Sequence, residues 1–483
     1  MRRTLLIGTA LAFGLLFIQP IQAEVKLPAI VSSNMVLQRN TTVQLWGWAD
    51  AGEKITIKPS WLQEPLRLTA DNDGNWAVSV KTTNTKASQI VNIKSNSSDI
   101  TLENIVFGEV WLCSGQSNMS QSFKGYTGQP TFGASLAVTK SRNPNLRLFT
   151  VERATSKTPL KNVGEHRPWQ MASPKNVLDF SAIAYFFGQQ LQEILDVPVG
   201  LIHTSWGGTP IESWMSMDMM STYKKIDLDT FNDRKQQSVP TVLYNAMINP
   251  LIPYTIKGTL WYQGESNRGK PDAYREFMPA LVKDWRAKWQ IGDFPFYYVQ
   301  IAPYFYNNPD AYQKPENTAF LREAQLQALE DIPNSGMATT MDVGEEFCIH
   351  PARKKEVADR LLFNALNQTY GYTSIDCAFP VFDSLEVKDG GAILKFKNAE
   401  TGIYSYNGLE GFEIAGENRV FYPAKAEIIK RQDVFVRSEK VKNPVAVRYA
   451  WRNWIKGTLF DVNLLPASSF RTDNWNNATQ AKD

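Results

Sequence analysis

One apolar, strand-like segment of the sequence ends in a turn that contains serine. The apolar run Glu109–Cys113 leads into Ser114-Gly-Gln-Ser-Asn118. A strand that stops at Gly-x-Ser presents a hydroxyl at the carboxyl edge of a sheet, where ligands bind in open α/β folds, and a following helix N-terminus stabilises negative charge. Ser117 is therefore a candidate nucleophile, with an ordinary Ser/Asn turn as the alternative. Met119 replaces the second glycine of the elbow pattern Gly-x-Ser-x-Gly, so the familiar α/β-hydrolase fold is not supported.

A nucleophilic serine needs a base, and the chain contains only three histidines, His166, His203 and His350. His203 lies in a strand-like run and His166 in a polar loop, so we expect both to be structural or solvated. His350 precedes a stretch with apolar residues at helical spacing, and Pro351 fits the first helical position. Because the positive end of a helix disfavours imidazolium, a carboxylate is needed to hold this ring. The nearby candidates are Asp342, Glu345 and Glu346.

Two segments rich in glycine and amides, Thr204–Trp214 and Thr259–Asn267, each follow an apolar strand-like run. Both are expected at the same carboxyl edge as the serine turn. Glycine lets a backbone N–H approach a ligand, and the side chain of Gln263 or Asn267 adds an amide donor, so the segments can form an oxyanion hole. A structural turn explains either segment alone, but serine, histidine and donors at one edge indicate acyl-transfer chemistry.

The elements that must position these loops fall into three parts, which suits a length of 483 residues. Residues 24–105 alternate in short strand-like runs and predict an all-β domain. Residues 106–379 alternate strand-like runs with helical periodicity, which predicts a parallel sheet with helices. Residues 380–483 return to short strands and predict a β-sandwich.

Composition excludes several classes of protein. The chain is 43% hydrophobic and 20% charged, which is typical of a globular protein. Its 51 Lys and Arg against 48 Asp and Glu give a net charge of +3 without a basic cluster, so we expect no nucleic-acid partner. The three cysteines, Cys113, Cys348 and Cys377, lack paired zinc-ligand spacing, and with only three histidines in the chain no metal site is expected. A bridge between Cys348 and Cys377 stays open.

The N-terminal segment Met1–Ala23 has the order of a secretory signal: a basic Arg2-Arg3 pair, a mainly apolar stretch, and Ala23 before Glu24. We expect its removal and a soluble periplasmic or secreted protein. No later stretch approaches 18 uninterrupted apolar residues, so no membrane insertion is expected.

Taken in order, the motifs resemble the sialate O-acetylesterase family of SGNH-type (GDSL-like) hydrolases. The motifs that carry the resemblance are Gly115–Met119, Trp206–Thr209, Gln263–Asn267 and Ile349–Pro351, with Asn34–Arg39, Arg448–Trp451 and Ser469–Thr472 in the flanking β regions. The resemblance spans nearly the whole mature chain. It implies a three-layer α/β/α hydrolase domain with a parallel sheet, flanked by N-terminal and C-terminal all-β domains. It also implies an enzyme that removes O-acetyl groups from sialic acids.

The resemblance assigns roles to individual residues. It makes Ser117 the nucleophile and His350 the general base. It implies as oxyanion donors the Ser117 N–H, Gly208, Asn267 and Gln263, with Gly207 second to Gly208. SGNH enzymes often carry an Asp two or three residues before the histidine, where this chain has Phe347 and Cys348. We therefore expect Glu346 as the third catalytic residue, with Glu345, Asp342 or a Ser-His dyad held by a backbone carbonyl as alternatives.

Other functions remain compatible with the same scaffold. One is deacetylation of acetylated xylan or another polysaccharide by the same machinery. The other, from a different class, is a non-catalytic carbohydrate-binding protein, which the missing Asp favours. Three tryptophans in or beside the motif loops, Trp206, Trp214 and Trp261, either stack on a sugar or pack in the core.

Overall fold

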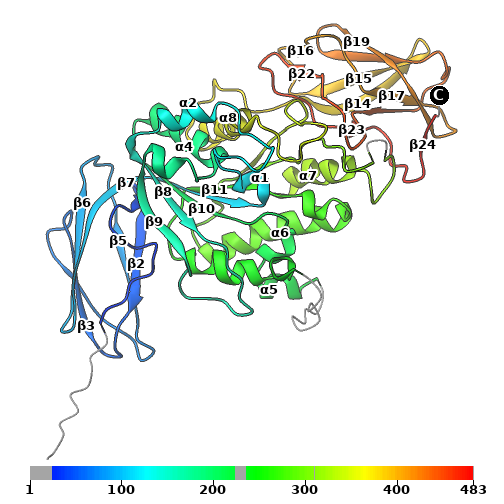
Figure 1. Cartoon of the computed structure of the whole chain (residues 1–483). Helices are drawn as coiled ribbons and strands as arrows, with labels where there is room; N and C mark the ends of the chain where they lie inside the picture. Colours follow the sequence, from blue (N-terminus) through cyan, green and yellow to red (C-terminus); the bar gives the residue numbers. More distant parts are fainter. Residues whose placement is uncertain (1–23, 224–234, 309–310, 482–483) are drawn as a thin grey trace, which may run out of the picture.

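The computed structural model describes residues 24–223, 235–308 and 311–481, so the expected signal segment 1–23 lies outside the described residues. A central α/β region lies between two β regions, one formed by each end of the chain (Figure 1). Among the described helices, none is both long and apolar enough to cross a membrane.

A large, mostly parallel sheet forms the centre of the molecule, with the strand order β13-β12-β11-β7-β10-β8-β9. Its members are β7 (Asp99–Gly115), β8 (Asn143–Val151), β9 (His166–Ala172), β10 (Val199–Ser205), β11 (Gly258–Tyr262), β12 (Phe296–Val299) and β13 (Ser335–Ala338). Strands β10 and β11 flank β7 in parallel, and their last residues, Ser205 and Tyr262, both pair with Gly115. The loops that follow these three strands therefore leave the sheet at one edge.

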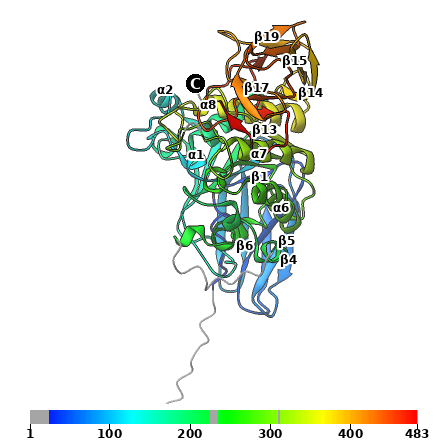
Figure 2. The ribbon, with the colours of Figure 1, turned by 90° about the vertical axis from the view of Figure 1, so that its right-hand side faces the viewer.

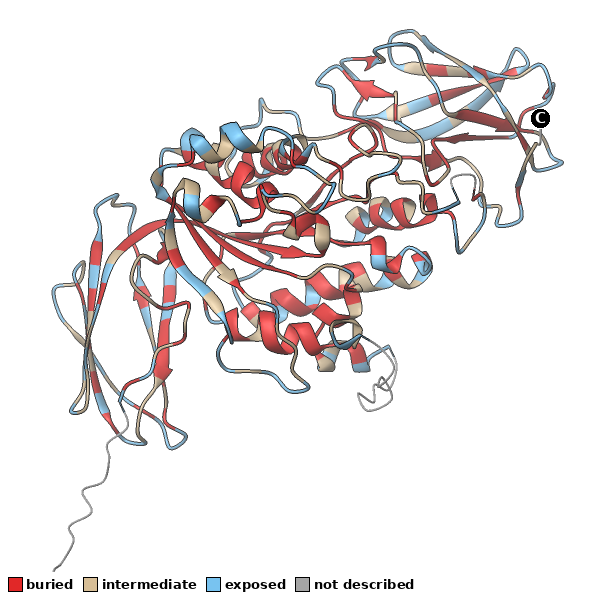
Figure 3. Ribbon diagram, in the orientation of Figure 1, coloured by how far each residue is buried: buried red, intermediate tan, exposed pale blue. Residues whose placement is uncertain are grey.

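Helices cover both faces of this sheet, so its strands are buried on both sides (Figure 3). Trp111 and Cys113 of β7 belong to the same core as the helices α4 and α8, whereas Val110 and Leu112 belong to the core that includes α6 and α7. The bounds are α4 (Ala182–Leu195), α6 (Pro271–Trp289), α7 (Ala319–Asp331) and α8 (Lys354–Asn364), with the shorter α2 (Ala134–Thr139), α3 (Pro174–Val177) and α5 (Met217–Ser221). This is the helix-covered parallel sheet that βα alternation predicts.

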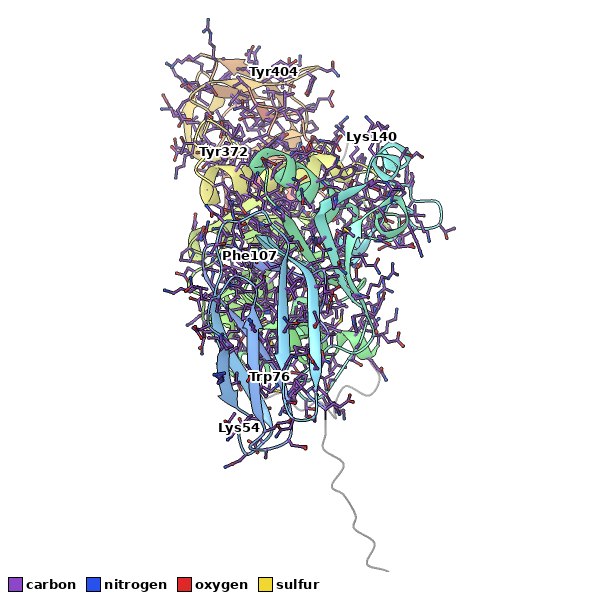
Figure 4. The ribbon with its side chains drawn as sticks, turned by 90° about the vertical axis from the view of Figure 1, so that its left-hand side faces the viewer. Lys54, Trp76, Phe107, Lys140, Tyr372 and Tyr404 are labelled. Carbon is purple, nitrogen blue, oxygen red and sulfur yellow. The ribbon has the colours of Figure 1, made fainter. Side chains whose placement is uncertain are left out.

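The N-terminal β region is continuous with the central sheet. Its strands are β1 (Val36–Gln38), β2 (Thr42–Trp48), β3 (Lys54–Pro59), β4 (Leu66–Thr69), β5 (Asn75–Lys81) and β6 (Gln89–Lys94). The first part of β7 pairs with β6, and its last part lies between β10 and β11. The expected boundary between residues 105 and 106 therefore falls inside one strand. Phe107, near this point, is buried against Trp61, 4.9 Å between ring centroids (Figure 4).

The C-terminal β region contains two larger sheets that share one core. Its strands are β14 (Val381–Lys388), β15 (Gly391–Lys397), β16 (Ile403–Tyr404), β17 (Phe412–Ala415), β18 (Val420–Pro423), β19 (Lys425–Ile429), β20 (Asp433–Arg437), β21 (Ala446–Tyr449), β22 (Phe460–Asp461), β23 (Phe470–Arg471) and β24 (Thr479–Gln480). The sheets run β14-β15-β20-β19 and β23-β21-β17-β18-β24. Leu394 and Val436 of the first meet Ile414 and Val447 of the second in that core. Two sheets around one core form a sandwich.

A buried arginine fixes this sandwich to the central region. Arg322 of α7 is fully buried, and its Nε donates to the Ser469 hydroxyl at 2.9 Å. Its Nη2 donates to the carbonyls of Ala450 at 3.2 Å and Arg452 at 2.7 Å. Because unpairing a buried charge is costly, these bonds hold the two parts in a fixed relation, with the sandwich at the far end from β2–β6 (Figure 2).

Candidate active site

The serine motif forms the turn that leaves the central strand. Strand β7 ends at Gly115, and the short helix α1 (Ser117–Ser120) begins after Gln116. Gly115 has φ +136°, and a Cβ there would lie 2.1 Å from the Tyr262 carbonyl oxygen, so only glycine fits. Ser117 is half-buried at the sheet edge where the sequence places it.

Backbone bonds join the three loops at this edge. The Trp206 N–H donates to the Gly115 carbonyl at 3.0 Å, which ties the loop after β10 to the serine turn. The Gln116 N–H donates to the Tyr262 carbonyl at 2.9 Å, and Gln116 Oε1 accepts the Ser266 N–H at 3.3 Å. The three sequence motifs that follow β7, β10 and β11 are therefore joined directly to one another.

The two glycines of the second motif lie beside the serine. A Cβ on Gly207 would lie 3.1 Å from the Cβ of Ser117, so the backbone of this loop approaches the serine closely. Gly208 has φ +74°, a left-handed conformation that favours glycine. The Thr209 hydroxyl donates to the Trp206 carbonyl at 2.7 Å and closes the turn.

The two amides of the third motif have different surroundings. Asn267 Oδ1 accepts from the Ile211 N–H at 2.9 Å and from Gln263 Nε2 at 2.7 Å, while its Nδ2 donates to Glu212 at 2.8 Å. Gln263 Nε2 also donates to the Thr209 carbonyl at 3.0 Å. Both hydrogens of Gln263 are thus bound within the protein, which corrects its expected role as an oxyanion donor. Gln263 instead orients Asn267, whose Nδ2 carries a second hydrogen.

The structure brings the histidine motif to the serine motif. The ring of Tyr126 lies 4.8 Å from that of His350 between centroids, and the Tyr126 hydroxyl donates to the Ser117 carbonyl at 2.9 Å. Asn118 Nδ2 donates to the Ile349 carbonyl at 3.1 Å. The residue after the serine and the residue before the histidine are therefore joined directly.

The side chain that holds the histidine is not the expected one. His350 Nδ1 is hydrogen-bonded to Oε1 of Gln129, so Gln129 stands where we expected Glu346. The other two candidates are engaged elsewhere: Glu345 accepts the Ala352 N–H at 2.7 Å, and both oxygens of Asp342 bind Arg360. Gln129 lies 221 residues from His350 in a polar loop without patterned spacing, so no local signal marks it.

Gln129 also determines the tautomer of the histidine. An amide oxygen only accepts, so Nδ1 carries the proton and Nε2 keeps its lone pair, the form that a general base requires. Burial, and then the positive charge of Lys354, lower the pKa of His350 to about 4. The imidazole is therefore neutral in neutral solution.

Helix α8 begins at Lys354, so the expectation of Pro351 in the first helical position is wrong. The residues between His350 and Lys354 form a loop that bonds to another loop: the carbonyl of Ala352 accepts the Phe132 N–H at 2.8 Å.

The remaining histidines are engaged locally. His203 is buried in β10, and its Nε2 bonds the Ser205 hydroxyl at 2.6 Å. Burial lowers the pKa of His203 to about 3. His166 Nδ1 faces the Gly164 carbonyl at 3.0 Å. Both arrangements agree with the structural role expected from the sequence.

One of the three motif tryptophans reaches the surface. Trp214 and Trp261 are fully buried and contact each other edge to face, 6.0 Å between centroids. Trp206 is only partly buried, and the guanidinium of Arg153 lies 6.0 Å from the centroid of its ring. Arg153 is exposed. Trp206 directly precedes Gly207, so the loop that approaches Ser117 also carries the ring that Arg153 faces.

A cavity of about 300 Å³ adjoins the oxyanion candidates. Its lining is Gly208, Pro210, Glu212, Ser238, Pro240, Ser266, Asn267 and Lys270. Substrate groups therefore have space next to Gly208 and Asn267.

The cysteines form no bridge, which answers the question left open for Cys348 and Cys377. All three cysteines are free. The Cys348 thiol donates to the His350 carbonyl at 3.1 Å, whereas Cys377 lies near Gln368, whose Nε2 is 3.9 Å from its sulfur. Within the described ranges, no three His, Cys, Asp or Glu side chains gather in a way that could hold a metal ion.

Comparison with known proteins gives consistent results. A family model described as "Carbohydrate esterase, sialic acid-specific acetylesterase" matches residues 107–358. The sialate O-acetylesterases of Pongo abelii and Homo sapiens are each 28% identical to this chain, over 88% of this chain and 87% of theirs. A solved carbohydrate acetylesterase from Xanthomonas citri is 32% identical, with a TM-score of 0.85 over 93% of this chain and 100% of that chain. The family match covers more than half of the chain and contains all four motifs. The chain is therefore an esterase, and it belongs to the carbohydrate esterase family of sialic acid-specific acetylesterases.

Proposed function

We propose that this protein hydrolyses O-acetyl esters of sialic acids through an acyl-enzyme on Ser117. The observation that carries the proposal is the joining of Ser117 to His350 through Tyr126 and Asn118, with His350 held in the tautomer of a base by Gln129. In this proposal the central region is an SGNH-type three-layer domain, residues 106–379, between β domains 24–105 and 380–483. The signal-like segment 1–23 directs export to the periplasm or the exterior.

The reaction proceeds in two halves. His350 Nε2 accepts the Ser117 proton as the hydroxyl oxygen attacks the acetyl carbonyl, and the oxyanion is stabilised by the N–H groups of Ser117 and Gly208 and by Asn267 Nδ2. Collapse breaks the ester bond, and His350 returns the proton to the sugar oxygen. Water, deprotonated by His350, then attacks the acetyl-serine; the bond between the acetyl carbon and the serine oxygen breaks, His350 returns the proton to that oxygen, and acetate leaves. The scheme requires neither a metal nor an organic cofactor.

The choice of sialic acid rests on Arg153. Sialic acids carry a carboxylate, and Arg153 is an exposed arginine whose guanidinium faces the ring of Trp206, the residue before the glycine that approaches Ser117. Arginine binds carboxylates through paired hydrogen bonds, and the Trp206 ring offers a face for the sugar. The relatives named sialate O-acetylesterases agree with this choice. A second candidate substrate is a polysaccharide such as acetylated xylan, since the similar protein from Xanthomonas citri is named a carbohydrate acetylesterase without reference to sialic acid.

Removing the Arg153 charge separates the two substrates. We expect Arg153→Met to raise KM for O-acetylated sialic acid by roughly 10-fold, because a charge-assisted hydrogen bond is lost. Acetate release from neutral acetylated xylo-oligosaccharide should not change. The measurement is acetate release from both substrates side by side, with Arg142→Met, another exposed arginine, as the control. Wild-type activity on the xylo-oligosaccharide alone would favour the polysaccharide esterase, and activity on neither would mean that the substrate is a different acetylated carbohydrate.

Restoring a carboxylate next to His350 tests the role of Gln129. In Gln129→Glu, a negative charge faces Nδ1 and stabilises imidazolium, so the pKa of His350 rises. A base must be neutral to work, so the acid limb of kcat/KM, near pH 4 in the wild type, moves to higher pH. The pH profile of acetate release measures this shift. A profile that keeps the wild-type limb would show that residue 129 does not face the catalytic imidazole.

A further inference from the structure

A buried lysine lies beneath the catalytic loops and has no part in the scheme above. Lys354, the first residue of α8, is 1% exposed. Its Nζ donates to Asn118 Oδ1 at 2.5 Å. A buried ammonium loses its hydration, which is costly unless the protein supplies partners. The neighbouring Lys355 is exposed and pairs with Asp359 at 2.8 Å, as surface lysines commonly do.

The partner of this lysine connects three loops of the site. Asn118 is fully buried; its Nδ2 donates to Glu265 Oε1 at 2.6 Å and to the Ile349 carbonyl at 3.1 Å, and its Oδ1 accepts from Lys354. Both amide hydrogens and the amide oxygen are thus engaged, so the side chain has one permitted orientation. Asn118 follows Ser117, and Ile349 precedes His350. Glu265 belongs to the loop that contains Asn267.

The charges of this group influence the base. Burial lowers the pKa of Lys354 to about 7, and the attraction of Glu265 and the weaker effects of Cys348 and Glu345 oppose that shift. Burial also raises the pKa of Glu265, 4% exposed, while its bond from Asn118 and the charge of Lys354 oppose the change. The lysine ammonium in turn disfavours a second positive charge on the imidazole.

The groups that face the imidazole come from separate elements. Gln129 bonds Nδ1, Tyr126 packs on the ring, and Lys354 acts through its charge. The first two are uncharged at the pH of the acid limb, since burial raises the pKa of Tyr126 to about 12. Lys354 is therefore the cation that acts on His350 in this group.

We propose that Lys354, Asn118 and Glu265 form a positioning unit that holds the nucleophile turn, the base loop and the oxyanion loop in one arrangement. The inference rests on the roles proposed for Ser117 and His350. Lys354 fixes the amide of Asn118, and its ammonium adds to the effect of burial in keeping His350 unprotonated in mildly acidic solution. None of the three touches the substrate.

The test compares Lys354→Met with Lys355→Met through kcat, KM and the pH profile of acetate release. We expect Lys354→Met to lower kcat roughly 10- to 100-fold with little change in KM, because small misplacements of reacting groups are costly. Loss of the ammonium raises the pKa of His350, so the acid limb moves to higher pH. A purely structural lysine would not move that limb. Lys355→Met should leave kcat and the limb as in the wild type.

A second variant protects the test from a failure to fold. Lys354→Met leaves Glu265 buried without its cation, whereas Lys354→Met with Glu265→Gln removes both charges and keeps an acceptor for Asn118. We expect the double variant to regain thermal stability while its acid limb stays at the higher pH.

The outcomes separate this inference from the proposed function. If Ser117→Ala is inactive and the acid limb of the Lys354 variants equals that of the wild type, the positioning unit is wrong and the function stands. If Ser117→Ala retains wild-type activity, both are overturned. A Lys354→Met enzyme with wild-type kcat would also overturn the positioning unit.

Discussion

Ser117→Ala lowers kcat for acetate release from O-acetylated sialic acid by on the order of 10⁴-fold, with little change in KM. The hydroxyl forms the bond to the acetyl carbon and has no substitute in the site, whereas the groups that bind the sugar are untouched. What activity remains comes from the oxyanion donors acting on water. Acetate quantification at saturating substrate measures the loss.

Ser114→Ala is the matched control for this variant. Ser114 lies three residues earlier in the same motif, and its hydroxyl is buried with no hydrogen-bond partner among the described residues. Its removal creates no unpaired group, so activity should stay near the wild-type value. Equal losses in the two variants would mean that the motif is damaged as a whole and would remove the case for Ser117.

His350→Ala should lower kcat by roughly 10³- to 10⁴-fold, because Ser117 then loses the group that accepts its proton. Residues that act as one unit do not contribute additively, so the double variant with Ser117→Ala should be no slower than Ser117→Ala alone. Single-turnover and steady-state rates for the three variants measure this. His166→Ala, which alters a histidine bonded to the Gly164 carbonyl, is the control. A further loss in the double variant would contradict a shared role for Ser117 and His350.

The sequence was sufficient to predict the edge of the sheet where the motifs meet. Ser117, Gly207 and Asn267 each follow an apolar strand, and parallel strands end at one edge. Register then determines which loops touch, and the pairing of Gly115 with both Ser205 and Tyr262 brings these three together. Local patterns of strand and turn were therefore enough.

The hydrogen-bond partner of His350 could not be predicted, because it comes from a loop that is distant in the sequence and is brought to the histidine only by the tertiary fold. Carboxylates close in sequence, such as Glu345, were plausible, but the loop directs that side chain to the N–H of Ala352. Gln129 comes from a distant loop, which packs beside Ser117 through Tyr126. Tertiary contacts of this kind leave no periodic signal in a sequence.

The buried unit of Lys354, Asn118 and Glu265 could not be predicted from the sequence for a related reason. A lysine in the first turn of an amphipathic helix, beside Arg353 and Lys355, has the pattern of a solvated face. Only the packing of α8 against the serine turn shows that one of these cations is buried. The continuity of the N-terminal β region with the central sheet could not be predicted either, since it depends on the pairing of β7 with β6 at one end and with β10 and β11 at the other.

Covalent labelling with a fluorophosphonate probe tests the central claim most directly. Only a serine activated by a neighbouring base reacts, so peptide mapping of the labelled wild-type protein should find the adduct on Ser117. His350→Ala should react far more slowly, and Ser117→Ala should remain unlabelled. An adduct on a different residue, or no adduct in a wild-type protein that releases acetate, would contradict a Ser117 acyl-enzyme.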